Sequence, residues 1–215
     1  MKIGIIGSGI VGRVLATAFI SEGEEVMLGT RNISKEEVLK WQQENPSGLL
    51  GSFQDTAQFG EIIVLAVGGL VAEDAITLAG KEHFIDKVVI DTTNPIAAVP
   101  PESGVLKYFT SLEESLMERL QKIIPDARLV KAFNSVGNAF MYKPSFSEGV
   151  PTMFICGNDA AAKQTVTTIL SRFGWDTADM GTAVSARAIE PLCILWCIPG
   201  FISNQWSHAF KLLKK

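Results

Sequence analysis

The sequence predicts an α/β protein with a doubly wound, mainly parallel sheet of about eight strands and a small helical extension at its C-terminal end. Two observations support this prediction. Short runs rich in β-branched residues alternate with amphipathic segments along the whole chain, which is typical of βαβ units. The chain has 215 residues, of which 47% are hydrophobic, and this is enough to build the core of one domain of ordinary size.

Strands are expected where apolar, β-branched runs are bounded by turn residues. In chain order these runs are residues 2–6, 25–28, 49–52, 61–67, 87–91, 128–133, 152–156 and 175–179. The run at 49–52 is the weakest of them.

Helices are expected between these runs. Ser34 with Glu37, and Ser111 with Glu114, match the S-x-x-E capping box, and Asn158 is expected to cap a third helix. Residues that stop helices mark several ends: Asn45 with Pro46, Gly80, Pro125 and Gly174.

A glycine-rich turn joins the first strand to the first helix. Its residues form the pattern G-x-G-x-x-G, namely Gly7, Ser8, Gly9, Ile10, Val11 and Gly12. In this context the first glycine allows the tight turn, the second lets the backbone approach a pyrophosphate, and the third lets the helix lie close to the strand. The helix N-terminus then favours the anion. The sequence therefore predicts a Rossmann-type dinucleotide site.

The end of the second strand indicates which dinucleotide binds. Sites that prefer NAD have an acidic residue there to accept a hydrogen bond from the ribose 2′-hydroxyl. This chain has Thr30, Arg31 and Asn32 instead, and a guanidinium pairs well with phosphate oxygens. We therefore expect NADP(H); the alternative is that Arg31 is only a solvated loop charge.

Three further strand ends are expected to line the same crevice. Val67 and Gly68 follow the fourth strand, Thr93 and Asn94 follow the fifth, and Asn134 follows the sixth. We expect Val67, Gly68, Asn94 and Asn134 to contact the cofactor. Thr93, Asn94 and Asn134 are also candidates for the acceptor pocket, where the Asn134 amide would fix a carboxamide or a ring carbonyl.

Residues 1–150 are predicted to form the NADP-binding domain, and residues 151–215 a small α/β extension packed on the same sheet. The connections at 92–110 and 134–151 are long for a compact domain, so they should border the site. Residues 183–215 are expected to be helical. The apolar tail 188–210, which carries Trp196, Phe201, Ile202 and Trp206, predicts a homodimer formed through it.

Composition excludes several other classes of function. The net charge of −4 argues against nucleic-acid binding. Three cysteines and two histidines, without a C-x-x-C pattern, predict neither a disulfide framework nor a metal site and suit a reducing cytoplasm. The apolar stretch 188–202 contains Glu190 and two prolines, so we expect no membrane crossing.

The chain also lacks the usual residues for proton transfer. There is no Y-x-x-x-K, G-x-S-x-G or H-E-x-x-H pattern. We therefore expect no catalytic acid or base, and a reaction that depends mainly on positioning two flat rings for hydride transfer.

Four patterns together resemble the coenzyme F420 (deazaflavin)-dependent NADP oxidoreductases: MKIGIIGSGIVG, GTRN after the second strand, KAFN at 131–134, and AIEPL in the apolar tail. The resemblance implies a Rossmann domain, NADPH lying across the strand ends, and direct hydride transfer to a deazaflavin. It also implies that Thr30, Arg31 and Asn32 hold the 2′-phosphate. The oxidoreductase domain of the membrane-bound metalloreductases looks similar too, with a comparable G-S-R-N, so a flavin or another small-molecule acceptor stays open.

Two other functions remain possible from the sequence. One is a reductase of imines or β-hydroxy acids, although only some 65 residues follow Pro151, where those enzymes have about 100 or more. The other is an NADPH-binding sensor or partner protein without catalysis.

Overall fold

One eight-stranded sheet forms the centre of the protein. The computed structural model describes residues 1–213, and the last two residues of the predicted helical segment 183–215 lie outside them. The strand order is β3-β2-β1-β4-β5-β6-β7-β8. The bounds are β1 Lys2–Ile6, β2 Glu25–Gly29, β3 Leu49–Gly51, β4 Ile62–Leu65, β5 Val88–Asp91, β6 Arg128–Lys131, β7 Thr152–Gly157 and β8 Asp176–Asp179. All neighbouring pairs are parallel except β6 and β7.

The predicted fold class is therefore confirmed, and each predicted run contains a strand. The predicted strands were too long at 61–67 and 128–133, because the chain leaves the sheet at Leu65 and Lys131 to form the loops of the crevice. The sheet continues past residue 150, since β7 and β8 extend it beyond β6.

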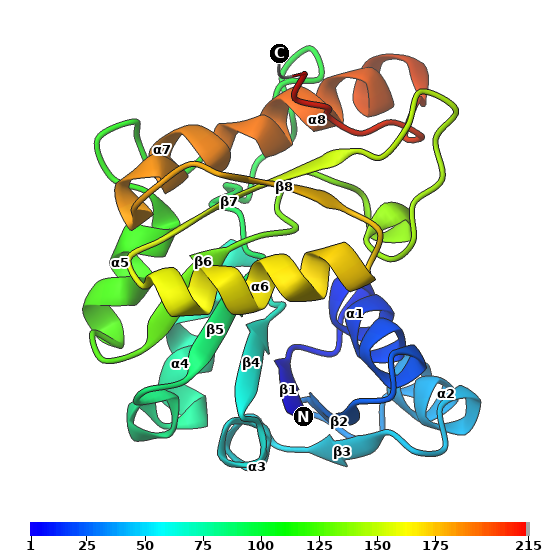
Figure 1. The fold of residues 1–215 in the computed structure, drawn as a ribbon, viewed down its shortest axis with the longest axis vertical. Helices are drawn as coiled ribbons and strands as arrows, with labels where there is room; N and C mark the ends of the chain where they lie inside the picture. The colour runs from blue at the N-terminus through cyan, green and yellow to red at the C-terminus, as the bar shows by residue number, and fades with distance from the viewer. Residues whose placement is uncertain (214–215) are drawn as a thin grey trace.

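Helices cover both faces of this sheet (Figure 1). One buried cluster joins the sheet to α1 Ile10–Ser21, α2 Glu36–Glu44 and α6 Ala160–Arg172. The cluster on the opposite face contains α3 Phe53–Phe59, α4 Ala72–Ala79, α5 Leu116–Ile123 and α7 Ala186–Ile189. Adjacent strand residues, such as Ile5 and Ile6, belong to opposite clusters because strand side chains alternate between faces.

The predicted helix starts were wrong by one to four residues. α2 begins at Glu36 with Lys35 as its N-cap, so Ser34 does not cap it. α5 begins after Ser115, whose capping box uses Glu118. Ser111 and Glu114 form an isolated β-bridge instead.

Two more caps were misplaced or missed. Asp159 caps α6, because its carboxylate accepts a hydrogen bond from the Ala162 amide at 2.7 Å. Asn158 instead accepts one from the Ala183 amide. α3 begins with a capping box between Ser52 and Asp55 that was not predicted.

The C-terminal segment is helical only as far as Ser203. After α7, α8 runs from Pro191 to Ser203, and residues 204–213 form no helix, contrary to the prediction. They fold back along the molecule: the Trp196 indole donates to the carbonyl of His208, and the Thr152 amide donates to the carbonyl of Phe210. Figure 1 shows this tail returning beside α8, in red.

In residues 1–213, one helical stretch, Ala183–Ser203, is long and apolar enough to cross a membrane by length and composition alone. Only a third of its most apolar window is buried. Glu190 within it is buried and paired, as described below, and this contact ties the stretch to the sheet.

Candidate functional site: two pockets at the strand ends

The glycine turn brings the first strand and first helix into close contact. Gly7 has a positive φ of 120°, and a Cβ there would lie 2.3 Å from the Ala66 carbonyl oxygen. A Cβ on Gly12 would lie 1.8 Å from the Gly7 carbonyl oxygen. Both positions therefore exclude a larger side chain, as the motif predicts.

Gly9 has the opposite environment. Nothing lies within 4 Å of the position that its Cβ would occupy. Gly9 is the N-cap of α1 and offers no side chain to the first-turn amides, and that turn contains no acidic residue. The site therefore leaves free space and amide donors where a pyrophosphate would approach.

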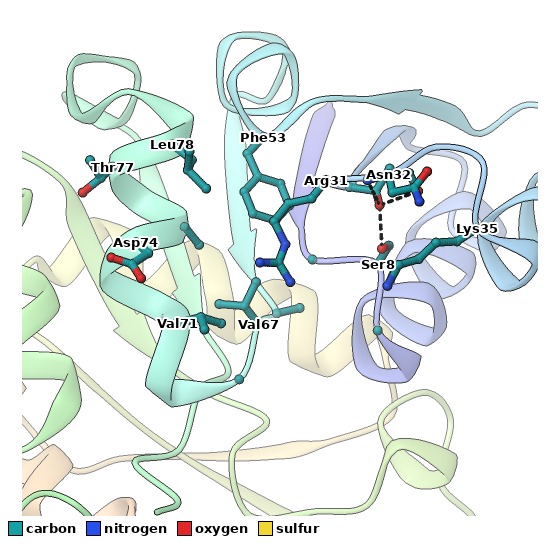
Figure 2. Close-up of a pocket in the computed structure, with 16 residues that line it drawn as sticks. Ser8, Arg31, Asn32, Lys35, Phe53, Val67, Val71, Asp74, Thr77 and Leu78 are labelled. Carbon is teal, nitrogen blue, oxygen red and sulfur yellow. Dashed lines mark hydrogen bonds between the residues drawn. The ribbon is translucent and has the colours of Figure 1, made fainter. Parts of the chain in front are cut away.

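A first pocket of about 810 Å³ lies over the ends of β1, β2 and β4 (Figure 2). Its lining includes Gly7, Ser8, Gly9, Thr30, Arg31, Asn32, Lys35, Val67 and Gly68. Figure 2 shows the Arg31 side chain reaching into it past Phe53 toward Val67, and Lys35 extending toward Ser8. Within residues 1–213, Arg31 makes no ion pair, so its guanidinium is available to an anion.

Thr30 has a bracing role in this pocket. Its buried hydroxyl accepts a hydrogen bond from Ser8 at 2.9 Å and donates one to the carbonyl of Asn32 at 3.1 Å. The Asn32 carboxamide oxygen accepts from the Ser34 amide. These bonds hold the glycine turn against the loop after β2, and they leave Arg31 and Lys35 as the cations facing the pocket.

Sequence reasoning missed Lys35 and Phe53. Lys35 lies four residues after Arg31, on the same loop, and its basic character at that spacing was an available signal. Phe53 comes from the start of α3, and with Val71 and Leu78 it contributes apolar surface to the far side of the pocket, where Asp74 and Thr77 add polar groups. Such a surface suits the flat ring of an adenine.

A second pocket of about 400 Å³ lies over the ends of β5 and β6. Four aromatic side chains line it, Phe133, Phe140, Trp196 and Trp206, together with the amides Asn94, Asn134 and Asn138. Val11 of the glycine motif also lines it, and Gly7, Ser8 and Gly9 line the first pocket, so both pockets border this motif. None of its described lining residues is charged.

Asn134 has an unsatisfied group in this second pocket. Only 3% of the residue is exposed, and its Oδ1 has no hydrogen-bond partner in the described structure. Its Nδ2 donates to the Ile189 carbonyl at 2.9 Å, which fixes the amide orientation. Because buried polar atoms are normally hydrogen-bonded, this carbonyl oxygen is a candidate acceptor for an N–H donor.

Of the remaining predicted residues, some line a pocket and others do not. Asn94 lines the second pocket and donates to the Asn134 carbonyl at 2.8 Å. Thr93 lies behind the pocket: it is 2% exposed, and its hydroxyl donates to Asp91 Oδ1 at 2.7 Å. Thr92 is the strand-end threonine that lines the pocket. Ile10 is largely exposed beside the glycine turn and lines neither pocket.

Comparisons with known proteins agree with this geometry. Residues 2–95 match the family model "NADP oxidoreductase coenzyme F420-dependent". A solved structure from Arthrobacter sp. FB24, assigned to the F420-dependent NADP reductases, superposes with a TM-score of 0.92 at 32% identity over 100% of both chains. The chain belongs to this family.

Curated members and relatives extend the comparison. The chain is 31% identical to the F420-dependent NADP reductase of Methanothermobacter thermautotrophicus over 155 residues, covering 67% of this chain and 66% of that protein. It is also 31% identical to Metalloreductase STEAP3 of Rattus norvegicus over 207 residues, covering 94% of this chain. The chain spans only 39% of that metalloreductase's length.

More distant structures share the fold alone. The Streptomyces aurantiacus imine reductase superposes with a TM-score of 0.66 at 14% identity, covering 94% of this chain and 64% of that one. The family's cofactor, NADP, fits the site: Gly9 leaves free space beside the amides of α1, Arg31 and Lys35 line the first pocket, and Asn134 Oδ1 has no hydrogen-bond donor within the described residues.

Proposed function

We propose that this protein is an NADP(H)-dependent oxidoreductase that transfers hydride between NADPH and a deazaflavin or another flavin-like acceptor. The observation that carries the proposal is that two unlike pockets border one glycine motif. The first has phosphate-binding cations and an apolar wall, and the second is aromatic and uncharged. A dinucleotide extended across the turn would place its adenosine in the first pocket and its nicotinamide in the second.

Each part of the chain has a distinct task in this proposal. The amides after Gly9 hold the pyrophosphate, and Arg31, assisted by Asn32 and Lys35, holds the 2′-phosphate. Val67 and Gly68 form the wall along which the cofactor crosses. Bound NADPH supplies the hydride, so the protein has to orient the rings and exclude water rather than move a proton.

The second pocket supports a flat, conjugated acceptor. Asn134 Oδ1 accepts a hydrogen bond from a carboxamide or ring N–H, and Asn94 holds the Asn134 backbone. The indoles of Trp196 and Trp206, whose ring centroids lie 5.7 Å apart, give the pocket an aromatic lining. The F420-dependent reductases and the metalloreductases named above motivate deazaflavin and flavin as the first acceptors to test.

The test is anaerobic oxidation of NADPH by the purified protein with deazaflavin, FMN, FAD, a quinone and a ferric chelate, with NADH run in parallel. Turnover with a deazaflavin or flavin and a strong preference for NADPH is the expected result. Tight NADPH binding without turnover on any of them would contradict the proposal and favour a sensor.

We also propose that the protein is a cytoplasmic homodimer. Trp196 is buried within the chain, but Leu195, Phe201 and Ile202 expose 55%, 46% and 66% of their surface along α8, and a dimer contact would cover them. The cysteines are free thiols, which suits a reducing compartment. Light scattering at micromolar concentration should give the mass of a dimer, and Phe201→Ser should shift it toward the monomer. A monomeric mass for the unaltered protein would refute this contact.

A further inference from the structure

Three charged side chains form a fully buried cluster behind the second pocket. Lys131 Nζ lies 2.7 Å from Asp91 Oδ2 and 3.0 Å from Glu190 Oε1. It also donates to the Thr93 carbonyl at 2.9 Å. Asp91, Lys131 and Glu190 are 0%, 0% and 1% exposed, so both carboxyl groups lie at ion-pair distance from the ammonium and out of contact with solvent.

This cluster carries one negative charge in excess. Two carboxylates surround one ammonium, and their charges and hydrogen bonds raise the pKa of Lys131 although burial alone would lower it. The Leu116 and Met117 amides at the start of α5 both donate to Glu190 at 3.0 Å. The positive end of the α5 dipole therefore faces the Glu190 side chain.

The cluster is separated from the second pocket by the thickness of its wall. Thr92 and Asn94, which line the pocket, flank Thr93, which bonds both Asp91 and Lys131. Cys193 lines the pocket one turn of helix after Glu190. A buried charge acts at this range with little screening from solvent.

Packing alone does not require this arrangement. Apolar residues of similar volume usually hold two elements together as well as a buried ion cluster does, and without the desolvation cost. The net charge of the cluster therefore calls for a role of its own.

We propose that the Asp91–Lys131–Glu190 cluster favours the oxidised, positively charged nicotinamide over the reduced, neutral one. This inference rests on the proposed placement of the nicotinamide in the second pocket. When hydride leaves with its electron pair, the ring that remains gains one positive charge. The excess negative charge behind the pocket wall stabilises that ring and so promotes hydride release to the acceptor.

The test compares the dissociation constants of NADP⁺ and NADPH, measured by titration calorimetry on the purified protein. Glu190→Gln and Asp91→Asn each remove one negative charge from the cluster while keeping its shape. Each should raise the ratio Kd(NADP⁺)/Kd(NADPH) roughly tenfold, the effect of one charge about 10 Å away at an effective dielectric constant near 20. The two variants lie on different elements, so either one decides if the other does not fold.

Two controls separate charge from structure. Glu118→Gln removes the carboxylate that pairs with Arg187 and so loosens the same helices, α5 and α7, at the surface. It should leave the ratio unchanged. The ligand 2′-phospho-ADP-ribose lacks the nicotinamide, so its affinity should be the same in all variants.

An unchanged ratio in both cluster variants, or an equal loss of affinity for all three ligands, would overturn the inference. Failure of the proposed function has a different signature: the unaltered protein would then bind neither NADP⁺ nor NADPH, or would bind NADPH and reduce none of the acceptors, whatever the ratio in the variants.

Discussion

Replacing Arg31 with alanine should weaken NADPH binding about ten- to thirtyfold and change NADH binding less than twofold. The guanidinium is exposed at the pocket and can form charge-assisted hydrogen bonds with a 2′-phosphate. Such bonds contribute about 1.5–3 kcal/mol each when shielded from water, and exposure reduces the total to about 1.5–2 kcal/mol. A difference of 1.4 kcal/mol is a factor of about ten in Kd.

Lys35→Ala should have a smaller effect, about two- to fivefold. Its side chain is 48% exposed and also lies 3.9 Å from Glu37, so its contribution to phosphate binding is about 0.5–1 kcal/mol. Titration of NADPH and NADH against both single variants and the double variant measures the contributions of Arg31 and Lys35 to the binding free energy. Lys40→Ala is the matched control, because it removes the same charge from α2 outside the first pocket.

The reasoning would be refuted by an equal loss for NADPH and NADH in Arg31→Ala. That result would mean that Arg31 supports the fold of the pocket or the adenosine, and not the phosphate. An unchanged NADPH affinity would support the alternative that Arg31 is only a solvated loop charge.

The other predictions concern the glycine turn and one surface ion pair. Gly9→Ala should leave the melting temperature nearly unchanged but weaken NADPH binding more than about tenfold, because its methyl group has space in the protein and occupies the pyrophosphate position. Gly12→Ala should destabilise the protein by about 2–3 kcal/mol, since its Cβ would overlap the Gly7 carbonyl; equal melting temperatures for the two variants would contradict this. The hydrogen bonds from Arg187 lower the pKa of Glu118 to about 2, so its stabilising contribution is complete above about pH 4.5 and is lost as the pH falls toward 2. Glu118→Gln should therefore lower the free energy of unfolding by about 1–2 kcal/mol at pH 7, after allowance for solvent screening, and by much less at pH 3, measured with urea; an equal loss at both pH values would refute the assignment.

The fold was predictable because its signal is local. The central strands β1, β4 and β5 are apolar runs buried on both faces, and such a run is visible in the sequence without knowing its neighbours. The helix starts were less predictable, because two S-x-x-E patterns follow one another at Ser111 and Ser115 and only one can begin α5. The structure selects Ser115, whose partner Glu118 also bonds Arg187, a residue 69 positions away. A contact between residues so far apart cannot be predicted from the local sequence pattern.

The site was predictable only in part for the same reason. The glycine turn and Arg31 lie in contiguous motifs, whereas the pocket walls are assembled from separate elements. Phe53 reaches the first pocket from α3, and Trp206 reaches the second from the tail after α8. Thr93 was expected in the pocket because the sequence does not show which of two adjacent threonines turns inward. Its hydroxyl turns toward Asp91, and Thr92 faces the pocket.

The buried Asp91–Lys131–Glu190 cluster is partly predictable from the sequence. Lys131 belongs to KAFN and Glu190 to AIEPL, and each is a charged residue within an otherwise apolar stretch. A charge in such a stretch is buried only if it is paired, so each residue already implies a partner of opposite sign. Asp91 ends the preceding strand and stands opposite Lys131 in the β5–β6 register, and residues directly opposite in neighbouring strands point to the same face. Once β5 and β6 are taken as neighbours, the Asp91–Lys131 pair follows from the sequence. Only Glu190, which comes from beyond the sheet and supplies the excess charge, required the structure.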